Sequence, residues 1–369
     1  MAALASFGVK PKELALAPRI SRLIRDARPE PAAEPCDHGR RYSRALRAGR
    51  ADLRSPQPRL ANGCSADGGC ADSSTAFRIW LQGAPVLPQA DRVEQRIAWL
   101  DAKNIDYQLV ATWPDIYGYS LAPERCVVWH RLLNDTLASW CADNAARFGF
   151  TASVPLPGAE AAAAELGRAV EIGAVGVMVP ANIEGVNVGE LELDAFWAKA
   201  EQVRLPVILH PVMVASAPRA AKFALAQSVQ YTFDTTLGIG SLLFSGVLDR
   251  FPRLELVLAH GGGAYPYLAG RLDVMHARMD RQAQGDVAAR APSEYLSSLA
   301  YDSIVHSAKS LRFLADLVGI DRLLLGTDYS FPPADLDPLD SLRAAGFGPA
   351  EVQAIACDNA RRIFSRIVR

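Results

Sequence analysis

Short apolar runs and longer amphipathic stretches alternate along the chain from about Arg78 onward. Seven runs are continuous enough to be strands: residues 108–112, 148–156, 174–180, 206–210, 254–260, 299–305 and 322–328. Such runs are typical of strands that helices cover on both faces. Amphipathic stretches at 93–104, 122–146, 159–172, 193–202, 237–250 and 310–318 precede or separate them. This repetition predicts an α/β protein with a parallel sheet.

The number of strands distinguishes a closed barrel from an open, doubly wound sheet. An open nucleotide-binding sheet usually carries a GxGxxG turn after its first strand, and the sequence has none there; the GGGAYP segment at 261–266 follows a late strand. A closed barrel needs eight strands, and seven are found. The missing one should precede the helix at 93–104. We therefore predict a (β/α)8 TIM-type barrel whose first strand is missing or degenerate.

The segment in which that strand should lie has an unusual composition. Residues 1–77 hold 13 Lys and Arg against 8 Asp and Glu, although the whole chain has a net charge of −1, and they contain only three Val or Ile residues. Such a segment buries little apolar surface against the entropy of ordering it. We predict that 1–77 is a poorly ordered N-terminal segment and that 78–369 form the barrel domain.

Composition narrows the class of protein further. Half of the 369 residues are hydrophobic, which is enough for a large core, and the six cysteines form no CxxC pair. The chain has no apolar run of membrane-spanning length and no secretory signal. Its small basic excess lies in a leader without interleaved aromatic residues. We expect a cytoplasmic protein with reduced thiols that binds neither membranes nor nucleic acids.

Three side chains with metal-binding or acid–base chemistry stand at the ends of predicted strands. His210 ends the run 206–210, His260 ends 254–260 and Asp328 ends 322–328. Each one alone could cap a backbone group, but the carboxyl ends of parallel strands meet at one face of a barrel. We therefore expect the three to converge. Imidazole and carboxylate suit a divalent ion such as zinc, and an unligated histidine beside it could act as general acid or base.

Two further residues are candidates for substrate binding. Trp113 begins the loop WPDIYGY at 113–119, whose aromatic side chains could line a pocket for a ring or pack over the barrel rim. Arg271, eleven residues after His260, could bind a carboxylate bidentately or lie in solvent on a helix.

Four motifs together resemble the amidohydrolase-related metal-dependent decarboxylases, a family that includes aminocarboxymuconate semialdehyde decarboxylase and enzymes acting on hydroxybenzoates. The motifs are LHP at 209–211, FPRLELVLAHGGGAYPYLAGR at 251–271, LLLGTDYSFP at 323–332 and DNARRIF at 358–364. The resemblance covers residues 90–366. It implies a metal-dependent (β/α)8 barrel that decarboxylates a small carboxylated aromatic or muconate-like acid without oxidation.

The resemblance also implies roles for individual residues. By motif, His210 and Asp328 would be metal ligands, zinc being the expected ion and manganese the alternative. His260 would be the catalytic acid–base residue that protonates the carbon losing carbon dioxide or activates a metal-bound water. Arg271 and Phe331 match family positions near the substrate. Family members are commonly dimers, so a homodimer is expected.

The sequence departs from the family at two places. The family's first strand ends in a His-x-His pair of metal ligands, whereas this chain has no His-x-His, and His38 is the only histidine in 1–77. Val212 and Met213 stand where the family often has an aromatic residue after His-Pro. Either the N-terminus has diverged, or part of 1–77 is translated from a wrong reading frame. With two ligands in place of four, we predict weakened metal binding. A hydrolase or hydratase on the same barrel and a catalytically silent barrel remain the alternatives.

Overall fold

The structure is a computed structural model that describes residues 93–212, 218–279, 288–329 and 331–367. The predicted N-terminal segment 1–77, including His38, lies outside the described residues, as does Met213. The expectations for these residues therefore stay predictions.

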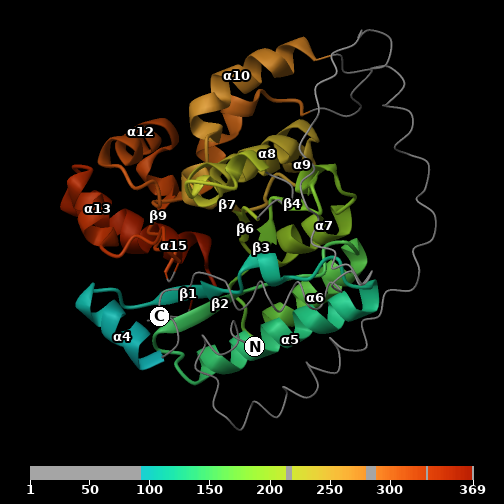
Figure 1. The fold of residues 1–369 in the computed structure, drawn as a ribbon, viewed down its shortest axis with the longest axis horizontal. Coiled ribbons are helices and arrows are strands. Elements are labelled where there is room, and N and C mark those ends of the chain that lie inside the picture. Colours follow the sequence, from blue (N-terminus) through green and yellow to red (C-terminus); the bar gives the residue numbers. More distant parts are fainter. Residues whose placement is uncertain (1–92, 213–217, 280–287, 330, 368–369) are drawn as a thin grey trace, which may run out of the picture. The chain divides into compact units, whose positions relative to one another are not determined.

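Seven parallel strands form the main sheet, in the order in which they occur along the chain (Figure 1). They are β1 (Gln108–Ala111), β2 (Phe148–Ala152), β3 (Gly176–Pro180), β6 (Val207–His210), β7 (Leu256–Leu258), β8 (Ala300–Asp302) and β9 (Leu323–Leu324). Every predicted strand is present, with its first residue at or slightly after the predicted one. The structure also contains a short antiparallel hairpin, β4 (Asn182–Ile183) and β5 (Val186–Asn187), which was not predicted.

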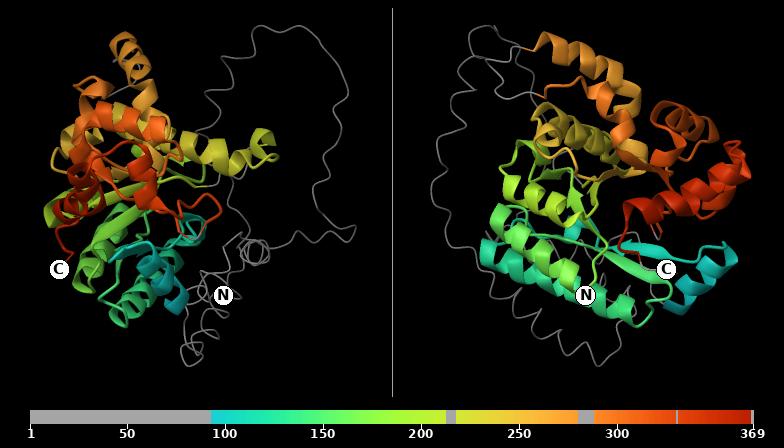
Figure 2. Two further views of the ribbon diagram at one scale, coloured as in Figure 1. Left: turned by 90° about the vertical axis from the view of Figure 1, so that its left-hand side faces the viewer. Right: turned by 180° about the vertical axis from the view of Figure 1, so that it is seen from behind.

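Helices separate the strands and lie on the outside of the sheet (Figure 2). They are α4 (Val93–Ala102), α5 (Pro123–Ala142), α6 (Ala159–Glu171), α7 (Asp194–Val203), α8 (Tyr231–Phe244), α9 (Val247–Arg250), α10 (Tyr265–Arg278), α12 (Ala308–Val318), α13 (Pro338–Ala344), α14 (Pro349–Gln353) and α15 (Asn359–Ile363). The predicted helix 237–250 was wrong in its bounds. It begins earlier, at Tyr231, and Gly246 interrupts it by adopting a φ of 70°.

The helix α12 shows how local sequence sets these boundaries. Its buried residues follow the i, i+3, i+4, i+7 spacing of a single helical face: Leu311, Leu314, Ala315 and Val318. The hydroxyl of Ser307 caps the first turn by accepting the backbone N–H of Ser310 at 3.3 Å. Gly319, with a φ of 95°, ends the helix. The apolar stripe therefore faces the sheet, and the caps fix the points at which the chain enters and leaves.

Alternate residues of the strands pack into two separate apolar clusters. Val207 and Leu209 of β6 belong to the larger cluster, with Trp197 of α7 and Ile239 of α8. Ile208, between them, belongs to a smaller cluster whose members from the other strands include Leu109, Val257, Ala300 and Leu324, together with Ile363 and Phe364 at the C-terminal end. The larger cluster joins sheet to helices, and the smaller one fills the concave side of the sheet.

The two edge strands of the sheet, β1 and β9, come together through side chains. Among the described residues no backbone ladder joins them, and no eighth strand lies between them. Instead, the side-chain amide of Gln108 on β1 donates to Thr327 Oγ1 just after β9, at 3.2 Å. The sheet is therefore curled into an incomplete barrel, as predicted, and we call the boundary between β1 and β9 the seam.

Two further observations concern the cysteine side chains and the length of the helices. Cys126, Cys141 and Cys357 are free thiols. Within the described part of the chain, no helix is long and apolar enough to span a membrane.

A histidine is completely buried between α5 and the strand layer. His130 is 0% exposed, and its Nδ1 lies 2.8 Å from the hydroxyl of Ser153. Its Nε2 has no hydrogen-bond partner within the described structure. The rings of Tyr117 and Tyr119 pack against it with centroids 5.3 Å away. Burial lowers the pKa of His130 to about 3, so the folded protein holds this ring neutral.

This burial predicts a specific loss of stability in acid. Below the unfolded-state pKa of about 6.5, the unfolded chain binds a proton that folded His130 refuses, so the free energy of unfolding falls by about 1.4 kcal/mol per pH unit. Between pH 6.5 and 5, His130 should account for about 2 kcal/mol of the loss. Urea denaturation at both pH values should show a smaller loss for His130→Asn. The exposed His306 gives the control, since His306→Asn should behave like the parent; equal losses in all three proteins would refute the prediction.

Candidate metal centre

The backbone around His210 fixes which ring nitrogen faces the site. His210 ends β6, and its Nδ1 lies 2.7 Å from the carbonyl oxygen of Pro211. A carbonyl only accepts, so Nδ1 must carry the proton, and Nε2 keeps its lone pair. The next residue, Val212, donates its N–H to Asp234 at 2.8 Å, and Asp234 in turn accepts from the amide of Asn182 at 2.7 Å. This buried network holds the loop after β6 in place.

His260 lies two residues beyond β7, on a tight 3₁₀ turn over His260–Gly262. Its φ is 55°, in the left-handed region that non-glycine residues rarely adopt. The carboxylate of Asp302, at the end of β8, accepts the backbone N–H groups of His260 and Gly261 at 2.8 and 2.9 Å. A Cβ on Gly263 would lie 2.0 Å from the carbonyl oxygen of Thr232. The glycine run therefore permits a left-handed turn packed closely against α8.

Asp328 follows β9 by four residues and also has a left-handed φ, of 50°. Backbone hydrogen bonds close the turn on both sides of it. The N–H of Phe331 donates to the carbonyl of Asp328 at 3.0 Å, and that of Asp335 donates to the carbonyl of Thr327 at 2.9 Å. The carboxylate is therefore carried on a constrained turn.

The structure brings His210, His260 and Asp328 together. One donor atom from each lies within 4.8 Å of the donors of the other two. His260 Nε2 is 3.8 Å from Asp328 Oδ2, and the two imidazole rings have centroids 5.1 Å apart. All three side chains are half-buried. Two imidazoles and one carboxylate at these separations form a candidate divalent-metal site.

The two histidines of this cluster titrate in opposite directions. Burial, reinforced by the neighbouring His260, lowers the pKa of His210 to about 4. Burial also lowers the pKa of His260, but contact with Asp328 and the charge of Asp302 raise it more, so the pKa of His260 lies above its ordinary value. At neutral pH His210 is therefore a neutral imidazole whose Nε2 offers a lone pair, whereas His260 takes up a second proton more readily.

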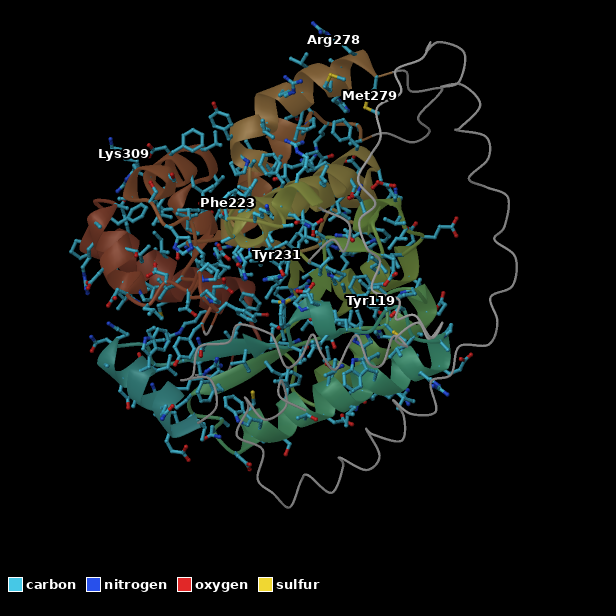
Figure 3. All side chains as sticks on the ribbon, in the orientation of Figure 1. Tyr119, Phe223, Tyr231, Arg278, Met279 and Lys309 are labelled. Atoms are coloured by element: carbon cyan, nitrogen blue, oxygen red, sulfur yellow. The ribbon has the colours of Figure 1, made fainter. Side chains whose placement is uncertain are left out.

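Aromatic side chains lie next to the turn that carries Asp328, because Phe331 belongs to that turn. The rings of Trp113 and Phe331 contact each other edge to face, with centroids 5.0 Å apart. Tyr231, at the start of α8 and labelled in Figure 3, donates its hydroxyl to Asp115 at 3.1 Å. Burial, followed by the negative charges of Asp115 and Asp328, raises the pKa of Tyr231, so the phenol stays protonated. Trp113 and Phe331, two of the three residues expected near the substrate, thus lie side by side.

Arg271 lies elsewhere, on the exposed surface of α10. No contact within the described structure joins it to the cluster. The reason is the helix geometry: α10 buries Tyr265 and Ala269 against the core, which leaves Arg271 in solvent. Its predicted role in substrate binding therefore has no support within a single copy of the chain.

Three residues near the cluster were not among those expected there: Asp302, Asp115 and Tyr231. Asp302 had a usable signal, because it lies within the strand run 299–305 and near its carboxyl end. Asp115 lies in the loop already singled out for Trp113. Tyr231 had no usable signal in the sequence, since its position depends on a loop and a helix start that apolar periodicity did not locate.

Comparisons with known proteins agree with this geometry. The family described as Amidohydrolase matches residues 88–366. The chain is 33% identical over 245 residues to a 2-amino-3-carboxymuconate-6-semialdehyde decarboxylase of Dictyostelium discoideum, covering 66% of this chain and 68% of that one. It is 28% identical over 296 residues to the gamma-resorcylate decarboxylase of a Rhizobium species, covering 74% and 87%. The crystal structure of 5-carboxyvanillate decarboxylase from Sphingomonas paucimobilis superposes with a TM-score of 0.68 at 25% identity, covering 75% and 84%.

NMR titration of the metal-free protein tests whether the pKa values of His210 and His260 shift in opposite directions. We expect the His260 ring to titrate above the ordinary value of about 6.5 and the His210 ring below it. Asp302→Asn should lower the pKa of His260, because it removes a neighbouring negative charge. Resonances can be assigned with His210→Gln and His260→Gln. A His260 pKa that does not change in Asp302→Asn would show that Asp302 has no electrostatic role.

Proposed function

Because the chain belongs to the amidohydrolase family, we propose that it is a metal-dependent, non-oxidative decarboxylase of a small carboxylated aromatic or muconate-like acid. The observation that carries this proposal is the cluster of His210, His260 and Asp328. The paired rings of Trp113 and Phe331 lie next to the Asp328 turn. The similarity of the chain to three decarboxylases, each named for a different substrate, supports decarboxylation as the reaction class.

The residues of the cluster fit a divalent ion in an unequal way. His210 has the arrangement usual for a metal-binding histidine, since a carbonyl fixes one ring nitrogen and leaves the other free. His260 lacks that support, because its Nδ1 is buried without a partner among the described residues. We therefore propose His210 and Asp328 as metal ligands and His260 as the acid–base group. Mixed nitrogen and oxygen donors favour zinc, with manganese the alternative.

A bound ion would polarise substrate oxygens as a Lewis acid. Residues of the chain would hold the substrate and supply the proton. Trp113 and Phe331 would hold the planar substrate by stacking or edge contacts. As the carbon–carbon bond to the carboxylate breaks, its electron pair stays on the ring carbon, and His260 donates the proton that forms the new C–H bond. Carbon dioxide leaves, and His260 regains a proton from water.

The proposed role of Arg271 requires the predicted homodimer. Since Arg271 is exposed on α10, we propose that it binds the substrate carboxylate in the site of a second copy of the chain. This agrees with the predicted homodimer. The cytoplasmic location likewise stays a prediction from the sequence.

Substitution of His260 tests the proposed reaction. Purified protein supplied with zinc or manganese should release carbon dioxide from one of a panel of hydroxybenzoates and carboxymuconate-type acids. His260→Gln should lower kcat by about a hundredfold or more while keeping the bound metal, because it removes only proton transfer. Asp328→Asn should lower both metal content and activity. Full activity of His260→Gln would contradict the assignment, and a product that gains water without gas release would indicate the hydrolase or hydratase.

Metal content tests the predicted weakening of the site. Two protein ligands hold an ion less tightly than four, so we expect clearly less than one metal per chain after purification, as measured by plasma mass spectrometry. Dialysis against a mild chelator should remove the remainder. Near-stoichiometric zinc or manganese would refute the weakening, and a folded protein without turnover on any acid would favour a silent barrel.

A further inference from the structure

A buried arginine lies at the seam between β1 and β9, close to the turn that carries Asp328. Arg96 of α4 is only 9% exposed, and within the described structure it forms no ion pair with a carboxylate. Among the described residues, its guanidinium donates from Nη2 to the backbone carbonyl of Tyr329, at 3.3 Å. Its guanidinium carbon is also 4.9 Å from the centre of the Tyr329 ring. Both contacts therefore reach the residue directly after Asp328.

Two further side chains hold the same turn. Trp99, three residues later on α4, stacks on the Tyr329 ring with centroids 4.2 Å apart and planes inclined by 21°. Gln108 of β1 donates to Thr327 Oγ1, which also accepts the backbone N–H of Tyr329 at 3.3 Å. The residues before and after Asp328 are thus both fixed from across the seam.

A purely structural role would not favour an arginine at this position. Burial lowers the pKa of Arg96 to about 10, which reflects the cost of placing its charge away from water. An apolar side chain of similar volume would fill the space without that cost. What an apolar residue cannot do is donate a hydrogen bond to the Tyr329 carbonyl. The hydrogen bond acts on a turn in which Asp328 has a strained φ of 50°.

We propose that Arg96 is a positioning residue which, with Trp99 and Gln108, holds the Asp328 carboxylate in its metal-binding orientation from across the seam. The inference rests on the proposed role of Asp328 as a ligand. In an ordinary barrel a neighbouring strand supports such a turn by a backbone ladder. Here the described contacts across the seam are made by side chains.

Metal affinity and amide exchange together test this proposal. Zinc dissociation constants are measured by competition with a chelating dye, and hydrogen exchange is followed in metal-free protein for the peptide containing Asp328 and Tyr329. Arg96→Met should weaken zinc binding by about tenfold, within the range found when groups that support a ligand are removed. It should also speed exchange in that peptide while peptides from α7 and α12 stay protected.

Two variants separate positioning from general packing. Arg96→Lys keeps a donor and a positive charge and should restore most of the zinc affinity. Arg361→Met, at an exposed arginine of α15, is the matched control and should bind zinc like the parent. If Arg96→Met does not fold, Trp99→Leu removes the stacking contact and should show the same local exchange.

Unchanged zinc affinity and unchanged exchange in Arg96→Met would overturn the proposal, as would faster exchange throughout the chain. If the parent itself binds no zinc, the proposed metal site fails, and exchange then decides the positioning role separately. Faster exchange confined to the Asp328 turn would support that role, and its absence would overturn it.

Discussion

Parallel pairing of successive strands is the constraint on which the site depends. Pro180 of β3 pairs with His210, and Leu209 pairs with Leu258 of β7, so the chain leaves both strands at the same end of the sheet. Side chains alternate between faces along a strand, and a register shift of one residue would exchange the two faces. The two apolar clusters, one on each face of the sheet, oppose such a shift, because it would move their members to the opposite face. Packing far from the site therefore determines which histidines meet.

The positions beyond the strands carry local strain that the surroundings must balance. His260 and Asp328 both have left-handed φ angles, each of which costs on the order of 1–3 kcal/mol for a residue with a side chain. The Asp302 carboxylate offsets this at His260 by accepting two consecutive backbone N–H groups. At Asp328 the compensation comes from turn hydrogen bonds and from α4. The two strained residues are thus supported by different means, one from a neighbouring strand and one from across the seam.

Local pattern was enough to predict the strands and the convergence of their ends, because buried parallel strands are continuous apolar runs and parallel topology fixes where they finish. Local pattern did not determine features that depend on distant contacts. The start of α8 depends on a loop without clear apolar periodicity, and the exposure of Arg271 depends on which face of α10 packs against the core. Asp302 stands near the carboxyl end of a predicted strand, but no spacing rule identifies the backbone N–H groups 41 and 42 residues away that it accepts. The order and direction of the strands can therefore be predicted from this sequence, whereas the contacts that support the site residues cannot.

The contrast between the two histidines shows why those supporting groups matter. His210 and His260 carry the same ring, are both half-buried and lie 5.1 Å apart, yet their pKa values move in opposite directions. The difference comes from their neighbours. Asp328 raises the pKa of both rings, but His260 has the charge of Asp302 in addition, whereas the neighbouring His260 lowers the pKa of His210. Strand ends bring two chemically equal groups together, and the carboxylate of Asp302 at the end of β8 helps to make their pKa values unequal. A lone pair for a metal and a proton for a reacting carbon can then come from the same type of side chain.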